Sequence, residues 1–185
     1  MPILDAEVSL FPDDLLADYR ASARGRRWWV VYTMARQEKA LARQLLRWEI
    51  PFYLPLVTKD SCIRGRRFRS HIPLFGGYVF LFARHDERTL ALTTNRISSV
   101  LAVVDQEELH RDLQQTQSLI ESGVELTAEP RLAPGNRVRV KGGPMRGLEG
   151  TIVSRRGRSH IFVAVNFLQQ GASVAIDDCL LEPLD

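Results

Sequence analysis

Hydrophobic residues recur along residues 27–122 with the alternating periods of strands and helices. Residues 27–34 are rich in aromatic and β-branched side chains, which is typical of a strand buried on both faces. In the next segment Leu41, Leu45 and Trp48 share one helical face, and Pro51 ends the helix after about residue 50. We expect an amphipathic helix whose opposite face is a basic stripe: Arg36, Lys39, Arg43 and Arg47.

The pattern continues with strands on either side of a basic hairpin. Pro55 makes the strand at 52–59 kinked or places it at a sheet edge. The charged residues of 60–71 gather around Gly65, which predicts an exposed hairpin. Strand-like composition resumes at 72–83, where a glycine pair, Gly76 and Gly77, allows a bulge or the close approach of another chain.

Two further helices are expected before residue 123. Asp86 can cap a short helix over 87–95, and a strand can follow at 98–104. Asp105 and Glu108 resemble a capping box that starts a longer helix, which Gly123 ends. The apolar side of this longer helix consists of Leu109, Leu113 and Ile120.

The last third of the chain alternates with the period of strands. Residues 136–142 place Val138 and Val140 on one side and basic residues, Arg137, Arg139 and Lys141, on the other. The same signal recurs at 149–155, 160–167 and 172–178. Short strands joined by tight turns predict a small β-barrel.

These elements predict an α+β protein with an N-terminal antiparallel sheet flanked by helices, a linker and a C-terminal barrel. The expected bounds are a flexible N-terminal extension at 1–24, an α+β domain at 25–122, a linker at 123–134 and the barrel at 135–185.

Charge is arranged in blocks that the net charge of +3 hides. Residues 21–71 carry twelve basic residues against three acidic ones, and residues 131–160 carry eight against Glu149 alone. The segments around these blocks are acidic. Two basic blocks suggest two surfaces that face polyanions; the alternative is that mixed charges only solvate the surface.

Composition argues against membrane, metal and disulfide classes. The apolar runs are far shorter than the roughly 20 residues of a membrane-spanning helix, and the acidic N-terminus is unlike a signal peptide. Two cysteines and four scattered histidines do not have metal-ligand spacing. We expect a cytoplasmic monomer without a metal or cofactor.

The glycine-rich segment 138–153 has only part of the pattern of a phosphate-binding loop. Gly142 and Gly147 have the spacing of such a loop, but Leu148 and Glu149 stand where lysine and a hydroxyl residue are needed, and a strand follows instead of a helix. The glycines therefore indicate tight turns. No nucleophile elbow or neighbouring Cys–His pair is present, and the side chains of Asp177 and Asp178 diverge, so we expect no enzyme.

The aromatic residues beside the arginines suggest a protein interface. Large rings at adjacent strand positions, such as Trp28 and Trp29, or at Phe75 and Tyr78 around the glycine pair, cannot all point inward. Most of them belong to the core, and the others are expected to form an exposed apolar patch.

Three segments together resemble the NusG family of bacterial transcription elongation factors: "WWVVYTMARQEKALARQL", "IPLFGGYVF" and "PGNRVRVKGGPMRGLEGTIV". The resemblance covers about residues 27–185 and implies a NusG-type N-terminal domain followed by a five-stranded KOW barrel. It implies a non-enzymatic factor that binds RNA polymerase and modulates pausing, termination and antitermination.

The resemblance also assigns residues to partners. It places the clamp region of RNA polymerase against Tyr32, Leu54, Leu74, Phe75 and Tyr78. It places the non-template DNA strand near Arg36, Lys39 and Arg43, which would give sequence-independent, salt-sensitive affinity. For the KOW domain it implies recruitment of Rho or a small-subunit ribosomal protein through Phe167 and Leu168, with a capped barrel end as the structural alternative.

Two departures from the family pattern limit what the resemblance carries over, whereas the basic hairpin favours a specialised role. Gly76 and Gly77 replace the usual proline-glycine or proline-asparagine, and the basic hairpin looks like the RfaH-like antiterminators, although Met34 and Ala35 replace basic residues of that branch. The alternating strands favour a KOW barrel over the helical hairpin known in that branch. The alternative function is a general RNA- or ribosome-binding module without polymerase affinity.

Overall fold

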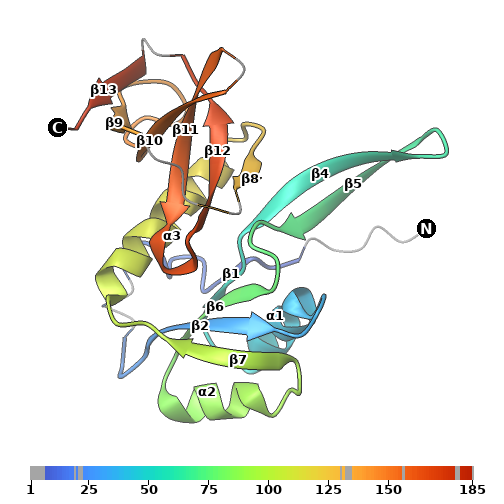
Figure 1. Cartoon of the computed structure of the whole chain (residues 1–185). Coiled ribbons are helices and arrows are strands. Elements are labelled where there is room, and N and C mark those ends of the chain that lie inside the picture. Colours follow the sequence, from blue (N-terminus) through green and yellow to red (C-terminus); the bar gives the residue numbers. More distant parts are fainter. Residues whose placement is uncertain are drawn as a thin grey trace. The chain divides into compact units, whose positions relative to one another are not determined.

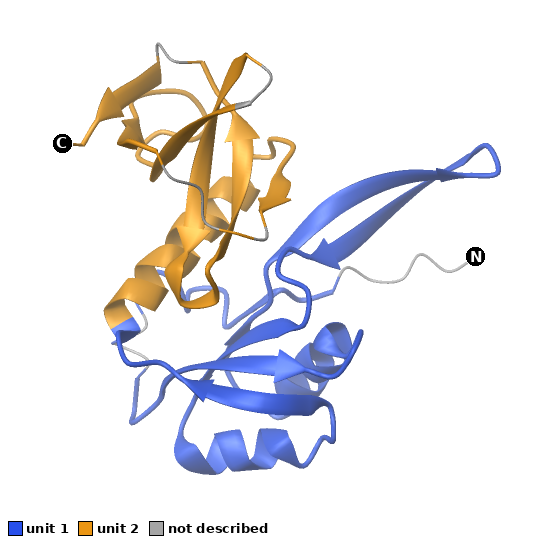
Figure 2. Cartoon of the chain, viewed as in Figure 1, with its two compact units in different colours: residues 1–106 blue, residues 107–185 orange. Residues whose placement is uncertain are grey.

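The structure, a computed structural model, forms two compact units, residues 1–106 and 107–185 (Figure 2). It describes residues 7–18, 20, 23–129, 131, 135–155, 157–177 and 180–184. The units divide at the start of the third helix, whereas the expected domains divide after it, so the domain bounds 25–122 and 135–185 stay a prediction. The mixed α+β class is confirmed by the elements of both units.

The first unit is built on a five-stranded antiparallel sheet with the order β1-β3-β6-β2-β7 (Figure 1). Its strands are β1 (Leu10–Phe11), β2 (Arg27–Thr33), β3 (Phe52–Tyr53), β6 (Tyr78–Ala83) and β7 (Ile97–Ala102). The unit also contains the helices α1 (Glu38–Arg47) and α2 (His85–Leu92), and a separate ribbon of β4 (Leu56–Ile63) and β5 (Arg66–Pro73).

The helices α1 and α2 pack on one face of this sheet. Leu41 and Leu45 of α1 are fully buried against Val31 and Leu81, as the helical spacing predicts. Because side chains alternate along a strand, the neighbouring residues of β2 and β6 face the other side. The second face is aromatic and buried too: Trp28, Tyr53, Phe80 and Phe82.

Two expected elements differ from the structure. The strand expected at 72–83 is divided, because β5 ends at Pro73 and the chain turns before β6 begins at Tyr78. Gly77, with a φ of +86°, completes that turn. The helix α2 begins earlier than expected: Glu87 accepts a hydrogen bond from the backbone N–H of Arg84 at 2.8 Å, and Asp86 lies inside the first turn.

Part of the N-terminal extension is ordered, contrary to expectation. β1 pairs with β3, and the backbone N–H of Leu54 donates to the carbonyl of Ser9 at 2.6 Å. Leu15 and Leu16 are buried. Backbone pairing thus holds residues 9–11 at the edge of the sheet. Residues 1–6 lie outside the described part of the chain.

The second unit contains most of α3 (Gln106–Glu121) and a six-stranded antiparallel sheet with the order β13-β9-β10-β11-β12-β8. Its strands are β8 (Thr127–Glu129), β9 (Arg137–Val140), β10 (Glu149–Arg155), β11 (Arg158–Val165), β12 (Gln170–Ala175) and β13 (Leu181–Pro183). A short 3-10 helix, η1 (Asn166–Leu168), joins β11 to β12. No pairing between β8 and β13 occurs among the described residues, so a closed barrel stays a prediction.

The glycine-rich segment is a tight turn between β9 and β10, as expected. The N–H of Gly147 donates to the carbonyl of Val140 at 2.8 Å, and Leu148 is buried. Val138 and Val140 point inward as predicted.

The hydrophobic pattern of the sequence predicted one buried residue of α3 incorrectly and did not predict β8. Leu109 and Leu113 of α3 are buried, but Leu119 takes the place expected for Ile120. β8 lies within the expected linker, where the hydroxyl of Ser173 donates to the buried carboxylate of Glu129 at 2.5 Å. No helix among the described residues is long and apolar enough to cross a membrane.

An ion pair between Arg26 and Glu87 ties the start of β2 to α2. The Arg26 Nη2 and Nε atoms donate to the Glu87 carboxylate at 2.6 and 2.9 Å. Burial raises the pKa of this carboxyl group, but the hydrogen bonds from Arg26 and the Arg84 backbone outweigh burial, and the pKa lies below its ordinary value. The pair therefore stabilises the fold above the ordinary glutamate pKa, and this contribution is lost as the pH falls through the lowered pKa.

We predict that Glu87→Gln lowers the free energy of unfolding at neutral pH by about 2 kcal/mol, because a charged hydrogen-bond acceptor is lost. Denaturant titrations from pH 7 to 3 should show the two proteins converging as the wild-type carboxylate is protonated. The exposed Glu49 offers a control, since Glu49→Gln should change stability by less than about 0.5 kcal/mol. A difference for Glu87→Gln that stays constant with pH would contradict this account.

Candidate functional site

The first candidate surface is a tyrosine pair at the end of the aromatic sheet face. Tyr32 of β2 stands opposite Tyr78 of β6, and their rings lie 5.1 Å apart between centroids, tilted by 53°. Tyr32 is 43% exposed and Tyr78 is half-buried. The same strand faces carry the buried Val30 and Phe80, so the aromatic core reaches the surface at this pair.

Gly77 holds the tyrosine pair in place. Its N–H donates to the Glu38 carboxylate at 2.7 Å, and its carbonyl accepts from the N–H of Thr33 at 2.7 Å. A Cβ on Gly77 would lie 2.7 Å from Cε2 of Tyr32. The ring of Tyr32 thus packs directly against the backbone of Gly77 and leaves no room for a side chain at that position. The hydrogen bond to Glu38 connects this turn to the first turn of α1.

Three of the five residues expected at a polymerase-binding patch are buried. Leu54, Leu74 and Phe75 are all nearly inaccessible, and Phe75 is only 2% exposed. The Phe75 ring meets Phe80 edge-on, at 6.3 Å between centroids. These three residues belong to the core of the first unit, whereas Tyr32 and Tyr78 can be reached from outside.

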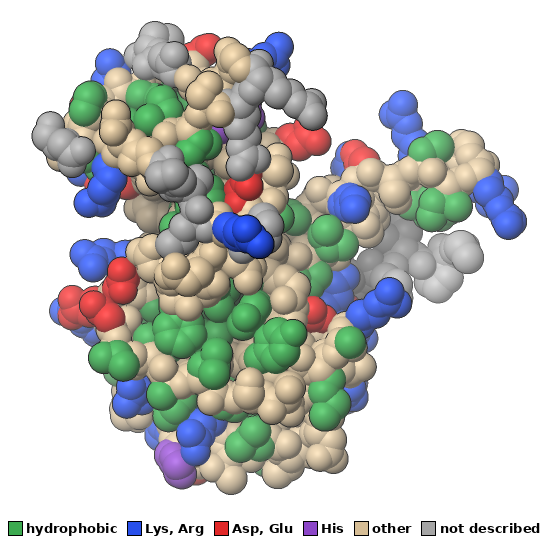
Figure 3. Space-filling view, viewed as in Figure 1, with side chains coloured by type: hydrophobic (Ala, Val, Ile, Leu, Met, Phe, Trp, Pro, Cys, Tyr) green, Lys and Arg blue, Asp and Glu red, His purple; other side chains and the backbone are tan. Residues whose placement is uncertain are grey.

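The pattern missed Leu101, which joins the exposed part of this face. Leu101 of β7 stands opposite Val30 of β2 and is exposed. Figure 3 shows hydrophobic side chains gathered over the strands of the first unit. The pairing of β7 with β2 places Leu101 there, and this pairing is not visible in the local sequence.

The second candidate surface is the basic stripe of α1. Lys39, Arg43 and Arg47 follow one another at intervals of four residues, and Arg43 and Arg47 are exposed. Arg36 is also exposed but precedes the helix, in a turn with a φ of +60°. Glu7 of the N-terminal extension lies 3.6 Å from Arg43, so an acidic residue competes for one cation of the stripe.

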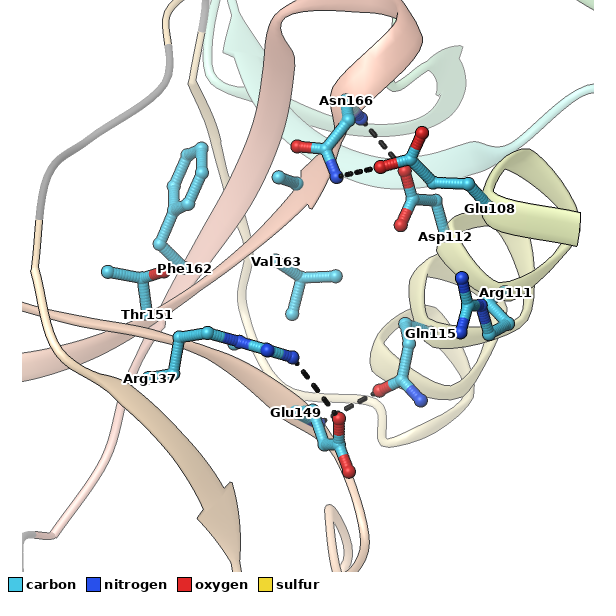
Figure 4. Close-up of a pocket in the computed structure, with 12 residues that line it drawn as sticks. Glu108, Arg111, Asp112, Gln115, Arg137, Glu149, Thr151, Phe162, Val163 and Asn166 are labelled. Atoms are coloured by element: carbon cyan, nitrogen blue, oxygen red, sulfur yellow. Dashed lines mark hydrogen bonds and ion pairs between the residues drawn. The ribbon is translucent and has the colours of Figure 1, made fainter. Parts of the chain in front are cut away.

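The third candidate surface is the η1 loop of the second unit, where the two expected partner-binding residues differ in exposure. Phe167 is 36% exposed, whereas Leu168 is buried. The loop is held by α3: the backbone N–H of Asn166 donates to Asp112 at 2.8 Å, and its side-chain amide donates to Glu108 at 3.1 Å (Figure 4). The second unit therefore presents Phe167 from a fixed loop.

A polar pocket lies beside this loop between α3 and the strands β10 and β11. Charged residues line it, among them Arg111, Arg137 and Glu149 (Figure 4). The backbone N–H of Glu149 donates to Gln115 at 2.9 Å, which closes one end of the pocket. No cluster of acidic, histidine or cysteine side chains that could hold a metal occurs in the described part of the chain.

The family model for the transcription termination factor NusG matches residues 26–118, half of the 185-residue chain. The chain belongs to the NusG family. The match contains the sheet, the tyrosine pair and the basic stripe of α1, and it ends inside α3. No curated protein matches the chain. As a member of the NusG family the protein is a transcription elongation and termination factor, and this family consists of transcription factors that are not enzymes.

In this NusG-family chain we predict that Gly77→Ala lowers stability by about 1–2 kcal/mol, because a residue with a side chain is strained at positive φ. The Tyr32 ring must also move to make room for the added methyl group. Thermal unfolding measures the loss of stability, and NMR of the tyrosine ring protons reports the movement of the ring. Gly76→Ala is the matched control, because its added Cβ meets no atom within 4 Å. Equal effects of both substitutions would contradict the role given to Gly77.

Proposed function

We propose that the protein binds the clamp region of RNA polymerase through Tyr32 and Tyr78 and modulates pausing, termination and antitermination. The tyrosine pair carries this proposal, because the structure of the turn keeps two large rings at the surface instead of in the core. Tyrosine is enriched among residues that dominate protein interfaces, because its ring is large and its hydroxyl remains hydrated. Leu54, Leu74 and Phe75 are buried and belong to the core of the first unit.

We also propose a location, an oligomeric state and a regulatory role for the protein. The protein acts in the cytoplasm as a monomer and serves as an RfaH-like antiterminator of particular operons, a role supported by its basic hairpin.

We expect Tyr32→Ala to weaken binding to bacterial core polymerase by about tenfold or more while the protein remains folded. Fluorescence anisotropy of the labelled protein, titrated with polymerase, measures the affinity, and circular dichroism checks the fold. Phe75→Ala is the matched comparison, because loss of this buried ring should destabilise the protein by about 3–5 kcal/mol.

Unchanged polymerase affinity of a folded Tyr32→Ala protein would refute the docking site. If the wild-type protein binds RNA tightly but does not bind polymerase, the alternative function, a general RNA- or ribosome-binding module, replaces the proposal.

We further propose that the stripe of α1 contacts the backbone of the non-template DNA strand through Arg36, Lys39 and Arg43. Arg36 is exposed in the turn before the helix, and on α1 the exposed Arg43 lies one helical turn beyond the half-buried Lys39. Such a row of cations suits a phosphate backbone, and its contacts are independent of sequence. The contact between Glu7 and Arg43 would have to open when DNA binds.

The charge-removing triple variant Arg36→Gln, Lys39→Gln and Arg43→Gln should therefore reduce the salt dependence of DNA binding. Each lost phosphate contact with a single strand lowers the slope of log K against log salt by about 0.7, or roughly 2 for three contacts. Glu7→Gln should instead strengthen binding at low salt, because it frees Arg43. If the triple variant keeps the wild-type slope, α1 is not the DNA-binding helix.

For the second unit we propose recruitment of Rho or a small-subunit ribosomal protein by a KOW-type barrel. Phe167 is the exposed apolar residue of the η1 loop and is the expected contact, with Leu168 beneath it. Phe167→Ser should abolish binding to the partner, which a pull-down with purified Rho and with the purified ribosomal protein would show. Because Phe167 is exposed, the substitution should not destabilise the unit.

A further inference from the structure

The ribbon formed by β4 and β5 projects from the first unit (Figure 1). Its eight residue pairs end in a turn in which Arg64 and Gly65 both have positive φ, the geometry of a tight two-residue hairpin. Among the described residues no third strand pairs with it. Both faces of the ribbon are therefore open over its outer half.

The register of the ribbon sorts its side chains into two different faces. Opposite residues share a face, and so do residues two positions apart along each strand. The pairing of Ser61 with Phe68 places Phe68 on the same face as Lys59 and Arg66. Arg66 lies on the side of Phe68 toward the turn, and Lys59 lies on the side toward the body of the unit.

The opposite face of the ribbon is polar over its outer half, and the imidazole of His71 is exposed on it nearer the body of the unit. This face carries Arg67 opposite Cys62, and Arg69 opposite Asp60. Asp60 is the one acidic residue of the ribbon, and it accepts a hydrogen bond from Arg69 at 3.1 Å. The two neighbouring arginines, Arg66 and Arg67, thus stand on different faces, although both are exposed.

No carboxylate among the described residues neutralises the cations on the ring-bearing face. No ion pair to Lys59 or Arg66 occurs in the described ranges of the chain. Phe68 is 46% exposed and Ile63, beside it, is 57% exposed. Figure 3 shows the Lys and Arg side chains along the ribbon with hydrophobic side chains between them.

We propose that this face of the ribbon binds single-stranded nucleic acid, with a base stacked on Phe68 and the flanking phosphates held by Arg66 and Lys59. An exposed ring between two unpaired cations meets both chemical features of a nucleotide chain, its flat bases and its charged backbone. A duplex hides its base faces and offers the ring nothing to stack on. An acidic protein surface would engage the cations but has no flat base to stack on Phe68.

This site is separate from the proposed contacts of α1 and does not depend on polymerase binding. It gives the protein a second nucleic-acid contact, on a ribbon that extends beyond the sheet. The chemistry is shared by single-stranded DNA and RNA, and the experiment distinguishes these two sources.

The test is anisotropy with the full-length protein, without polymerase, and fluorescent 15-residue oligomers of thymidine and of uridine over a range of salt concentrations. Phe68→Leu keeps an apolar side chain but removes stacking, and should weaken binding roughly 5- to 100-fold. Phe68→Trp should retain binding. Arg66→Gln should lower the salt slope by about 0.7, whereas the matched variant Arg67→Gln should leave it unchanged.

Several outcomes would overturn the proposal. Equal effects of Arg66→Gln and Arg67→Gln, with no effect of Phe68→Leu, would indicate diffuse attraction without a binding face. Loss of binding only in the triple variant of α1 would assign the strand to that helix. Retention of oligomer binding in the ribbon variants, together with loss of binding to a glutamate-rich peptide, would indicate an acidic protein partner.

If the ribbon variants weaken binding as expected, a preference of the wild type for one oligomer identifies DNA or RNA as the ligand.

Discussion

The register of β2 with its two neighbours, β6 and β7, is the constraint on which the first unit depends. β2 is a central strand whose alternate residues enter two different cores: Val31 lies beneath the helices, and Val30 belongs to the aromatic face. If the pairing of β2 slipped by one residue, each of its side chains would move to the opposite face of the sheet, and neither core could keep its packing. The same register brings Tyr32 opposite Tyr78, so the position of the exposed pair is a consequence of core packing.

Two of the surfaces proposed for binding, the tyrosine pair and the basic stripe of α1, are extensions of this arrangement. The turn at Gly77 fixes the tyrosine pair and, through Glu38, the start of α1. The helix in turn directs its basic stripe away from the leucines that it buries. A NusG-family protein needs no catalytic groups for such a role, because rigid placement of apolar and basic side chains is sufficient to bind a large assembly.

Local patterns predicted those features that depend on local spacing. The buried face of α1, the exposed hairpin and the inward valines of β9 follow from periods of 3.6 and 2 residues. The strands β1 and β8 were missed, because each is two or three residues long and is stabilised by pairing with a distant strand. The burial of Phe75 could not be predicted either, since its turn between β5 and β6 brings it against Phe80.

The tyrosine pair is the proposed docking face for polymerase. The most direct measurement replaces Tyr32 with a photoreactive phenylalanine analogue and identifies the cross-linked protein after assembly with core polymerase, with the same analogue at Phe167 as the comparison. We predict a cross-link from position 32 to the clamp region and none to it from position 167. A folded protein that binds polymerase but cross-links from position 167 alone would contradict the central claim.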